Sequence, residues 1–230
     1  MLRAGSVCKL ALLASLGLGA SACAVPHGSF ARPVVAPPEG ASLVGAGVMV
    51  PVVVAESDES SEGLSSLEDL PRVGQVVPTA SFDHHLSSRH TLGVEAGYID
   101  TEFGGFLLLH PRWELALNST LSLTGDLALG LGRSIEGPGS FAQLSLTFGV
   151  RLYFPTGFGG FVLSQQMGTG IATFYAPGSV AYDIPIVINE RFTLHIFPEF
   201  RWDPTINYGV PAYARWFVFG SAGVGTMLQF

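Results

Sequence analysis

The stretch FDHHLSSRH at residues 82–90 holds the side chains best suited to covalent chemistry. His85 and Ser87 are two residues apart, and alternate residues of a strand point to the same face. A serine becomes a nucleophile when a nearby base takes its proton and a third group orients that base. Asp100 or Glu102 is the candidate for the third group. The spacing makes a hydrolase one hypothesis for this chain.

The same stretch contains three histidines, His84, His85 and His90, but their spacing matches no familiar metal-ligand pattern. We therefore predict no metal site and no cofactor. Polar turns between strands often contain histidines, and a turn is the interpretation we favour for residues 82–90.

A second set of ionisable residues is spread along segments in which polar and apolar residues alternate. If the polar faces enclose a lumen, acids and bases can pair there, away from lipid. Two interpretations stay open: a path for a small solute, or a plug of ion pairs that holds the protein rigid. The residues are His110, Arg112, Glu114, Asp126, Arg151, His195, Glu199 and Arg201.

Alternation with a period of two dominates the chain from residue 42 onward. The best segments are longer than the mean soluble strand of about 5–6 residues, and a tilted membrane-spanning strand needs about 9–11. Phe217 and Phe219 break the pattern, which predicts a bulge or a packed lumen there. We predict ten strands, with eight as the alternative, at 43–54, 73–84, 89–99, 104–118, 121–132, 140–154, 160–174, 180–189, 191–203 and 211–230.

The composition indicates where such strands would lie. The chain is 48% hydrophobic and only 13% charged, against about 25% charged in ordinary globular proteins. A soluble barrel needs a charged exterior, which this chain cannot supply. We therefore predict an all-β, antiparallel, up-and-down transmembrane β-barrel. A soluble periplasmic lipoprotein that binds an apolar ligand is the less favoured alternative.

The N-terminal region carries export signals. Residues 1–22 combine basic Arg3 and Lys9 with an apolar run and small residues, which predicts a signal peptide. The residues before Cys23 resemble a bacterial lipobox, so both lipidation at Cys23 and ordinary cleavage stay open. Residues 23–41 are predicted to form a Pro-rich periplasmic spacer, and residues 42–230 the barrel.

The connections between strands differ in length. Short ones at 118–120, 155–160 and 189–191 alternate with longer ones, which is the bacterial outer-membrane pattern of short periplasmic turns and long extracellular loops. The acidic segment 56–71 is predicted to be an extracellular loop, with a periplasmic linker as the alternative.

The C-terminal segment GVGTMLQF resembles the terminal β-signal of bacterial outer-membrane β-barrel proteins, in which a glycine is followed by alternating hydrophobic residues and a final aromatic. Gly225, Leu228 and Phe230 fit that pattern. The resemblance implies a location in the outer membrane of a Gram-negative bacterium. It also implies three partners: the assembly machinery, outer-membrane lipid and lipopolysaccharide.

The resemblance to barrels does not specify an activity. The favoured function is therefore non-enzymatic: a structural, adhesive or narrow-pore role, with a small solute as a candidate partner. The alternative rests on His85-Leu86-Ser87, which resembles the H-x-S core of outer-membrane lipid A deacylases, although the motif lies early in the chain and Ser88-Arg89 departs from that family. Nucleic acid is excluded as a partner, because the net charge is −7 and Lys9 is the single lysine.

Overall fold

The computed structural model describes residues 39–56, 76–101, 104–133, 140–170, 173–207 and 215–230. Every regular element in these ranges is a β-strand. None of the described residues belongs to a helix long and apolar enough to cross a membrane. The strands are β1 (Ser42–Glu56), β2 (Val77–His85), β3 (His90–Thr101), β4 (Gly104–Ala116), β5 (Leu121–Arg133), β6 (Ser140–Thr156), β7 (Gly159–Gly170), β8 (Thr173–Tyr175), β9 (Gly178–Val187), β10 (Thr193–Asn207) and β11 (Arg215–Gln229).

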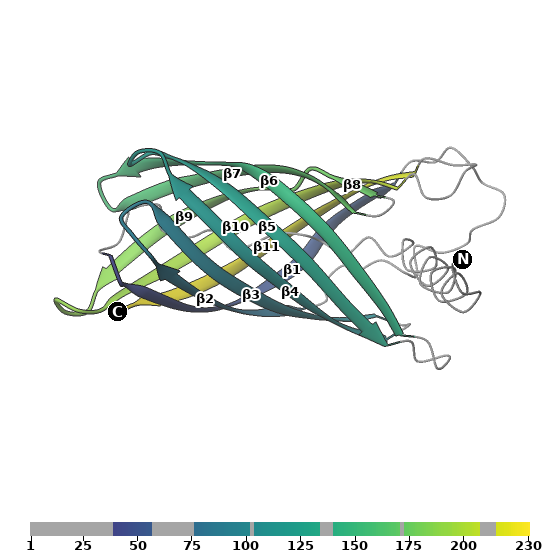
Figure 1. The fold of residues 1–230 in the computed structure, drawn as a ribbon, viewed down its shortest axis with the longest axis horizontal. Helices are drawn as coiled ribbons and strands as arrows, with labels where there is room; N and C mark the ends of the chain where they lie inside the picture. Colours follow the sequence, from purple (N-terminus) through teal and green to yellow (C-terminus); the bar gives the residue numbers. More distant parts are fainter. Residues whose placement is uncertain (1–38, 57–75, 102–103, 134–139, 171–172, 208–214) are drawn as a thin grey trace, which may run out of the picture.

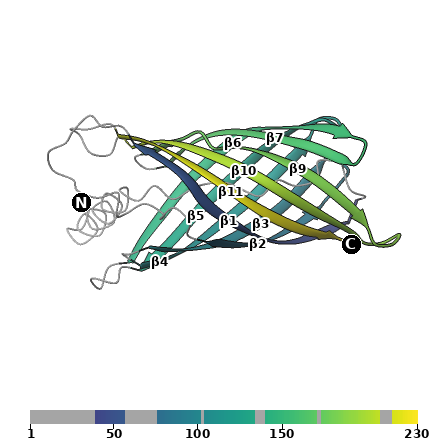
Figure 2. The same cartoon turned by 180° about the vertical axis from the view of Figure 1, so that it is seen from behind.

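The strands close into a ring, which Figure 1 shows from the side and Figure 2 from behind. Each strand is antiparallel to its neighbours, and β11 pairs with β1 from Leu43–Gln229 to Glu56–Phe217. β8 and β9 share one position, since both pair with β7 and β10. The molecule is therefore a closed ten-stranded antiparallel β-barrel, as predicted.

The eight-strand alternative is wrong. The second and seventh predicted strands alternate poorly, yet both form complete ladders with their neighbours as β2 and β7. Backbone pairing on both sides holds them in the ring, because each unpaired N–H and C=O would otherwise lack a partner. The seventh segment is interrupted after Gly170, and β8 begins at Thr173.

The irregularity expected near Phe217 and Phe219 lies on the neighbouring strand instead. The β1–β11 register shifts between Pro51 and Val53, whereas β10 and β11 pair without interruption. Pro51 has no N–H to donate, so a bulge at this position costs the ladder little. The side chains of Phe217 and Phe219 lie outside the described residues.

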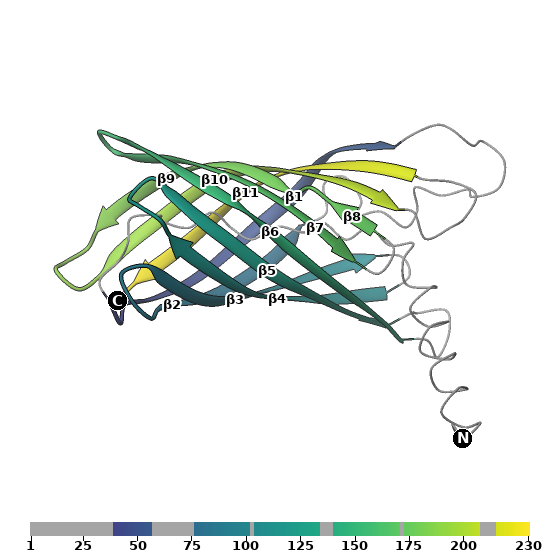
Figure 3. The same cartoon turned by 45° about the horizontal axis from the view of Figure 1, so that its top comes forward.

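The tight turns gather at the end of the barrel that carries the C-terminus (Figures 1 and 3). In two of them an asparagine side chain takes the place of a backbone acceptor: Asn118 Oδ1 accepts from the N–H groups of Thr120 and Leu121, and Asn189 Oδ1 from those of Arg191 and Phe192. These turns explain why β4 ends at Ala116 and β10 begins at Thr193, two residues inside the predicted limits.

The barrel is polar inside and apolar outside. Buried positions on the strands carry mostly Ser, Thr, Asp, Glu, His and Arg, and these alternate with exposed Leu, Val, Ile and Phe. On β6, for example, Ser145, Thr147 and Arg151 face the lumen, while Leu146 and Phe148 face outward and are 43% and 58% exposed. This is the reverse of a soluble barrel, whose apolar residues fill the interior.

The predicted signal peptide and Cys23 lie outside the described residues, as do most of the spacer and nearly all of the acidic segment 56–71. These assignments stay predictions.

Candidate functional site

The structure does not bring the proposed catalytic residues together. His85, at the end of β2, lies opposite Thr91 on β3, and its Nδ1 is 2.8 Å from Thr91 Oγ1. The backbone of Asp100 is nine residues further along β3, opposite Gly105, which corresponds to about 30 Å. Asp100 therefore sits toward the other end of the barrel from His85 and cannot orient its imidazole.

Ser87 has a structural role in the β2–β3 turn. Its Oγ accepts hydrogen bonds from the backbone N–H groups of Arg89 at 3.2 Å and His90 at 3.1 Å. Such a hydroxyl stabilises a turn. The three histidines also separate: His84 Nδ1 is 3.0 Å from Ser42 Oγ, and the His90 ring lies beside Trp113. Over the residues with described positions, no group of three or more His, Cys, Asp or Glu could hold a metal ion.

The ionisable residues predicted for the lumen do face it. Seven of the eight are buried, and the eighth, Arg201, has an 11% exposed side chain. They come from four strands, β4, β5, β6 and β10, and alternate residues of each strand point inward. The structure divides them into a belt at mid-height and two groups nearer the tight turns.

Arg112 is the anchor of the belt. Its guanidinium donates to Asp83 Oδ1 at 3.0 Å, to Asp83 Oδ2 at 2.6 Å and to Glu95 Oε2 at 3.0 Å. The Arg112 and Asp83 side chains are both 0% exposed. A buried guanidinium held by two carboxylates from two other strands fixes the relative positions of β2, β3 and β4.

A glycine makes the Arg112–Asp83 pair reachable. Gly93 on β3 faces Asp83 on one side and Arg112 on the other, so the ion pair passes over it. A Cβ atom at Gly93 would overlap Asp83 Oδ1. The same arrangement recurs at Gly149, where Gln166 on β7 reaches over β6 to donate to Thr124 Oγ1 on β5 at 3.2 Å. Because these two glycines have no side chain, polar groups can bond across them and join strands that are not adjacent.

The predicted cluster lacks Asp83. This residue falls both in the predicted strand 73–84 and in the stretch 82–90, which is interpreted as a turn. The alternation Ser81–Asp83–His85, which continues the inward face of β2, was the signal that could have located it. The predicted cluster also lacks Glu95 and Asp183. Both belong to it in the structure, since Glu95 binds Arg112 and Asp183 binds His195.

The opposite wall of the belt is formed by Glu199 and Arg201 on β10. Arg201 Nε lies 3.0 Å from Glu199 Oε1, and its Nη2 donates to Glu199 Oε2 at 3.2 Å. On the facing wall, His110 is two residues from Arg112 on β4 and shares its inward face. We define the charged belt as Asp83, Glu95, His110, Arg112, Glu199 and Arg201.

The register of the strands places His110 opposite Arg201. β4 and β10 are five strands apart in either direction around the ring. Because the strands are tilted, a path of paired residues from Arg201 reaches β4 at one residue around one wall and at a different residue around the other wall. The residue of β4 at the same height as Arg201 lies midway between these two residues. Around one wall, facing residues lead from Arg201 to Ala116 through Ser179, Ser164, Arg151 and Ser122.

Around the other wall, facing residues lead from Phe197 to Leu108 through Gly225, Gly47, Thr79 and Gly97. Arg201 is four residues beyond Phe197 on β10, so its own path ends at Gly104. The residue midway between Gly104 and Ala116 is His110. Arg201 and His110 therefore face each other across the lumen.

Two further polar groups line the walls. Glu114 accepts from Ser122 Oγ at 2.6 Å and from Arg151 Nη1 at 2.8 Å, which joins β4, β5 and β6. Asp126 accepts from the Gln166 side-chain amide. These bonds run along the wall between nearby strands.

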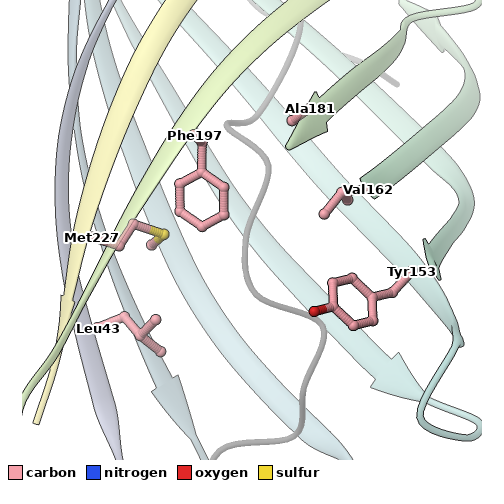
Figure 4. Packing of buried hydrophobic residues seen from close by; sticks show 6 residues of the cluster. All are labelled: Leu43, Tyr153, Val162, Ala181, Phe197 and Met227. Atoms are coloured by element: carbon pink, nitrogen blue, oxygen red, sulfur yellow. The ribbon is translucent and has the colours of Figure 1, made fainter. Parts of the chain in front are cut away.

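The remaining wall is partly apolar. Figure 4 shows six inward side chains contributed by β1, β6, β7, β9, β10 and β11: Leu43, Tyr153, Val162, Ala181, Phe197 and Met227. His195 lies beside them, stacked on Phe197 with ring centroids 6.0 Å apart, and its Nδ1 is 2.9 Å from Asp183 Oδ1. These apolar side chains occupy the lumen toward the tight-turn end.

The residues of the terminal signal lie where the ring closes. Gly225 faces Gly47 and Leu228 faces Val44 across the β1–β11 junction. Phe230 and Ser42 exchange both backbone hydrogen bonds, at 3.0 and 2.9 Å, and the Phe230 side chain is 50% exposed.

Comparisons with known proteins add little beyond the barrel. No protein-family model matches the chain, and no curated protein matches it. One similar solved structure is the P. putida toluene transporter TodX, which is 8% identical, with a TM-score of 0.32 over 87% of this chain and 92% of that one. Another is a deltaS2 mutant of TodX, a monoaromatic hydrocarbon channel, also 8% identical, with a TM-score of 0.31 over 86% and 92%. A likeness this distant says nothing of what this chain binds.

Proposed function

We propose that this chain is an integral outer-membrane β-barrel protein whose lumen is a narrow, charge-lined passage for small polar solutes. The observation that supports it is the reversed polarity of the ring. Outward side chains are mostly apolar on the described parts of the strands, and the charged belt lies inside. In water such an exterior would drive aggregation, whereas lipid solvates it.

The dimensions agree with a membrane. Apart from the three-residue β8, the strands contain 9 to 17 residues, and a tilted spanning strand needs about 9–11. The apolar outer surface would contact outer-membrane lipid, including lipopolysaccharide in the outer leaflet. The turn end would face the periplasm, as short turns do in bacterial barrels.

A hydrolase is not favoured. Ser87 Oγ accepts two backbone N–H groups in an exposed turn, and Asp100 lies far along β3. A nucleophile needs its base and an orienting group within hydrogen-bond reach, and this geometry does not supply them.

A second candidate is a closed, purely structural barrel. It is favoured by the burial of the belt, in which the side chains of Asp83, Arg112 and Glu199 are 0% exposed. Both candidates require insertion into lipid and differ in whether the purified protein conducts.

The membrane assignment can be tested with two phenylalanines. Phe148 faces outward in the middle of β6, whereas Phe158 lies in the β6–β7 turn and is 88% exposed. Phe148→Lys should destabilise the barrel by about 2–4 kcal/mol, the cost of a lysine at the bilayer midplane, while Phe158→Lys should cost about 0–1 kcal/mol. Urea unfolding in lipid vesicles measures both changes in stability. The folded fraction is detected by its faster gel migration when the sample is not boiled.

Equal effects of the two substitutions, or a wild-type protein that fractionates with soluble proteins and shows no difference between boiled and unboiled samples, would refute the membrane assignment. Planar-bilayer recording then separates the two candidates. Defined conductance steps support the passage, and a silent but folded protein supports the structural barrel.

A further inference from the structure

The inward face carries more acid than base. Among the described residues, seven inward carboxylates accompany three inward guanidiniums, those of Arg112, Arg151 and Arg201, which leaves four negative charges in excess when histidines are neutral. The carboxylates are Asp83, Glu95, Glu114, Asp126, Asp183, Glu199 and Asp203. Charge of one sign inside a low-dielectric wall concentrates the opposite ion.

The acids are also distributed along the whole lumen. On β10 and its neighbour β9, Asp203 lies toward the loop end, Glu199 in the belt, and Asp183 near the tight turns. Asp126 accepts from the Gln166 side-chain amide, and Asp183 Oδ1 is 2.9 Å from His195 Nδ1. A cation that has lost part of its hydration shell would therefore meet carboxylate oxygens at successive levels, as in cation channels lined by acidic rings.

Arg201 differs from Arg112 and Arg151, the other two inward arginines whose side chains the structure describes. The Arg112 and Arg151 side chains are 0% and 2% exposed, and each bonds to a carboxylate on another strand. Arg201 is 11% exposed, pairs with Glu199 on its own strand, and faces His110 across the lumen. Among the inward arginines whose side chains are described, Arg201 is thus the one most exposed to the path.

We propose that the passage selects small cations and that Arg201 is the residue that narrows it and limits its cation selectivity. This inference rests on the proposed passage function. Fixed carboxylates attract cations along the lumen, and the guanidinium of Arg201 repels cations at the belt, where Arg201 faces His110. Removing this charge leaves Glu199 and Glu95 to act on the permeating ion.

The test is single-channel recording in planar bilayers with a KCl gradient, using Arg201→Gln and the control Arg191→Gln. Arg191 is exposed in the β9–β10 turn, so its substitution changes the net charge equally without touching the belt. Arg201→Gln should raise the unitary conductance several-fold and shift the reversal potential toward that of potassium. Arg191→Gln and Arg201→Lys should both resemble the wild type.

The role of Arg201 is overturned if the wild type conducts and Arg201→Gln has the same conductance and reversal potential, or if its reversal potential shifts toward that of chloride. The passage function is then unaffected. Silence of both proteins, with unboiled gel migration showing that both are folded, overturns the passage itself. If Arg201→Gln fails to fold, Arg201→Lys and Glu199→Gln decide: Glu199→Gln must lower the preference for potassium, and unchanged selectivity refutes the proposal.

Discussion

At the scale of single residues, the lumen depends on side chains that are absent as much as on those that are present. Gly93 and Gly149 each stand between two polar residues on neighbouring strands, and each lets one reach the other. A guanidinium or amide can then join strands two apart, which ordinary cross-strand pairs cannot do. The ion pair between Arg112 and Asp83 therefore depends on three strands, β2, β3 and β4.

Gly93→Ala tests this arrangement, because its Cβ would overlap Asp83 Oδ1 and displace the carboxylate from Arg112. Breaking a buried pair costs about 3–5 kcal/mol, so the urea midpoint of the folded barrel should fall. Gly97→Ala is the matched control. It lies on the same strand and the same face, and its added Cβ would meet nothing nearer than Thr79 Cγ2 at 3.5 Å. Equal midpoints for the two variants would contradict the role assigned to Gly93.

At the scale of elements, the tight turns determine where the long strands end and begin and how they pair. Asn118 and Asn189 each supply a side-chain oxygen to two backbone N–H groups, which ends one strand and starts the next within a few residues. The turns hold β4 against β5 and β9 against β10. They also fix the register, and with it which residues face the lumen.

Asn118→Ala removes the acceptor for the N–H groups of Thr120 and Leu121. The loss should be about 1–2 kcal/mol, since each net hydrogen bond contributes about 0.5–1.5 kcal/mol and the exposed turn regains some from water. Asn118→Asp keeps an acceptor and should remain close to the wild type. Ser119→Ala, in the same turn, is the control. Urea unfolding followed by unboiled gel migration measures all three, and an Asn118→Ala midpoint equal to that of Ser119→Ala would disprove the role.

At the scale of the whole molecule, the barrel exists only once its first and last strands meet. β1 and β11 are separated by most of the chain, yet they pair along nearly their full lengths. Closure removes both sheet edges, which a membrane would leave without hydrogen-bond partners. Phe230 lies at this junction, bonded through its backbone to Ser42.

Phe230→Ser should lower the amount of folded protein in the outer membrane, because the terminal aromatic belongs to the signal that this chain resembles. The measurement is the heat-modifiable fraction in isolated outer membranes. Phe158→Ser, which changes an exposed turn residue, is the control. Normal levels of the Phe230→Ser protein would show that assembly does not depend on the aromatic.

The sequence by itself determined the architecture. Alternation with a period of two needs only neighbouring residues, so strand positions, the number of strands and the inward direction of His110, Arg112, Glu114 and Arg151 could all be predicted. The low fraction of charged residues likewise indicates an apolar exterior. These are local or compositional properties, and they do not depend on which strands meet.

Only the tertiary structure decided which inward residues form a site. Asp83 meets Arg112 from two strands away, and Arg201 faces His110 because the tilt of the strands displaces the register around the ring. The same geometry separates Asp100 from His85, which sequence spacing alone had allowed to meet. Tilt and closure are properties of the completed ring, so no segment read alone contains them.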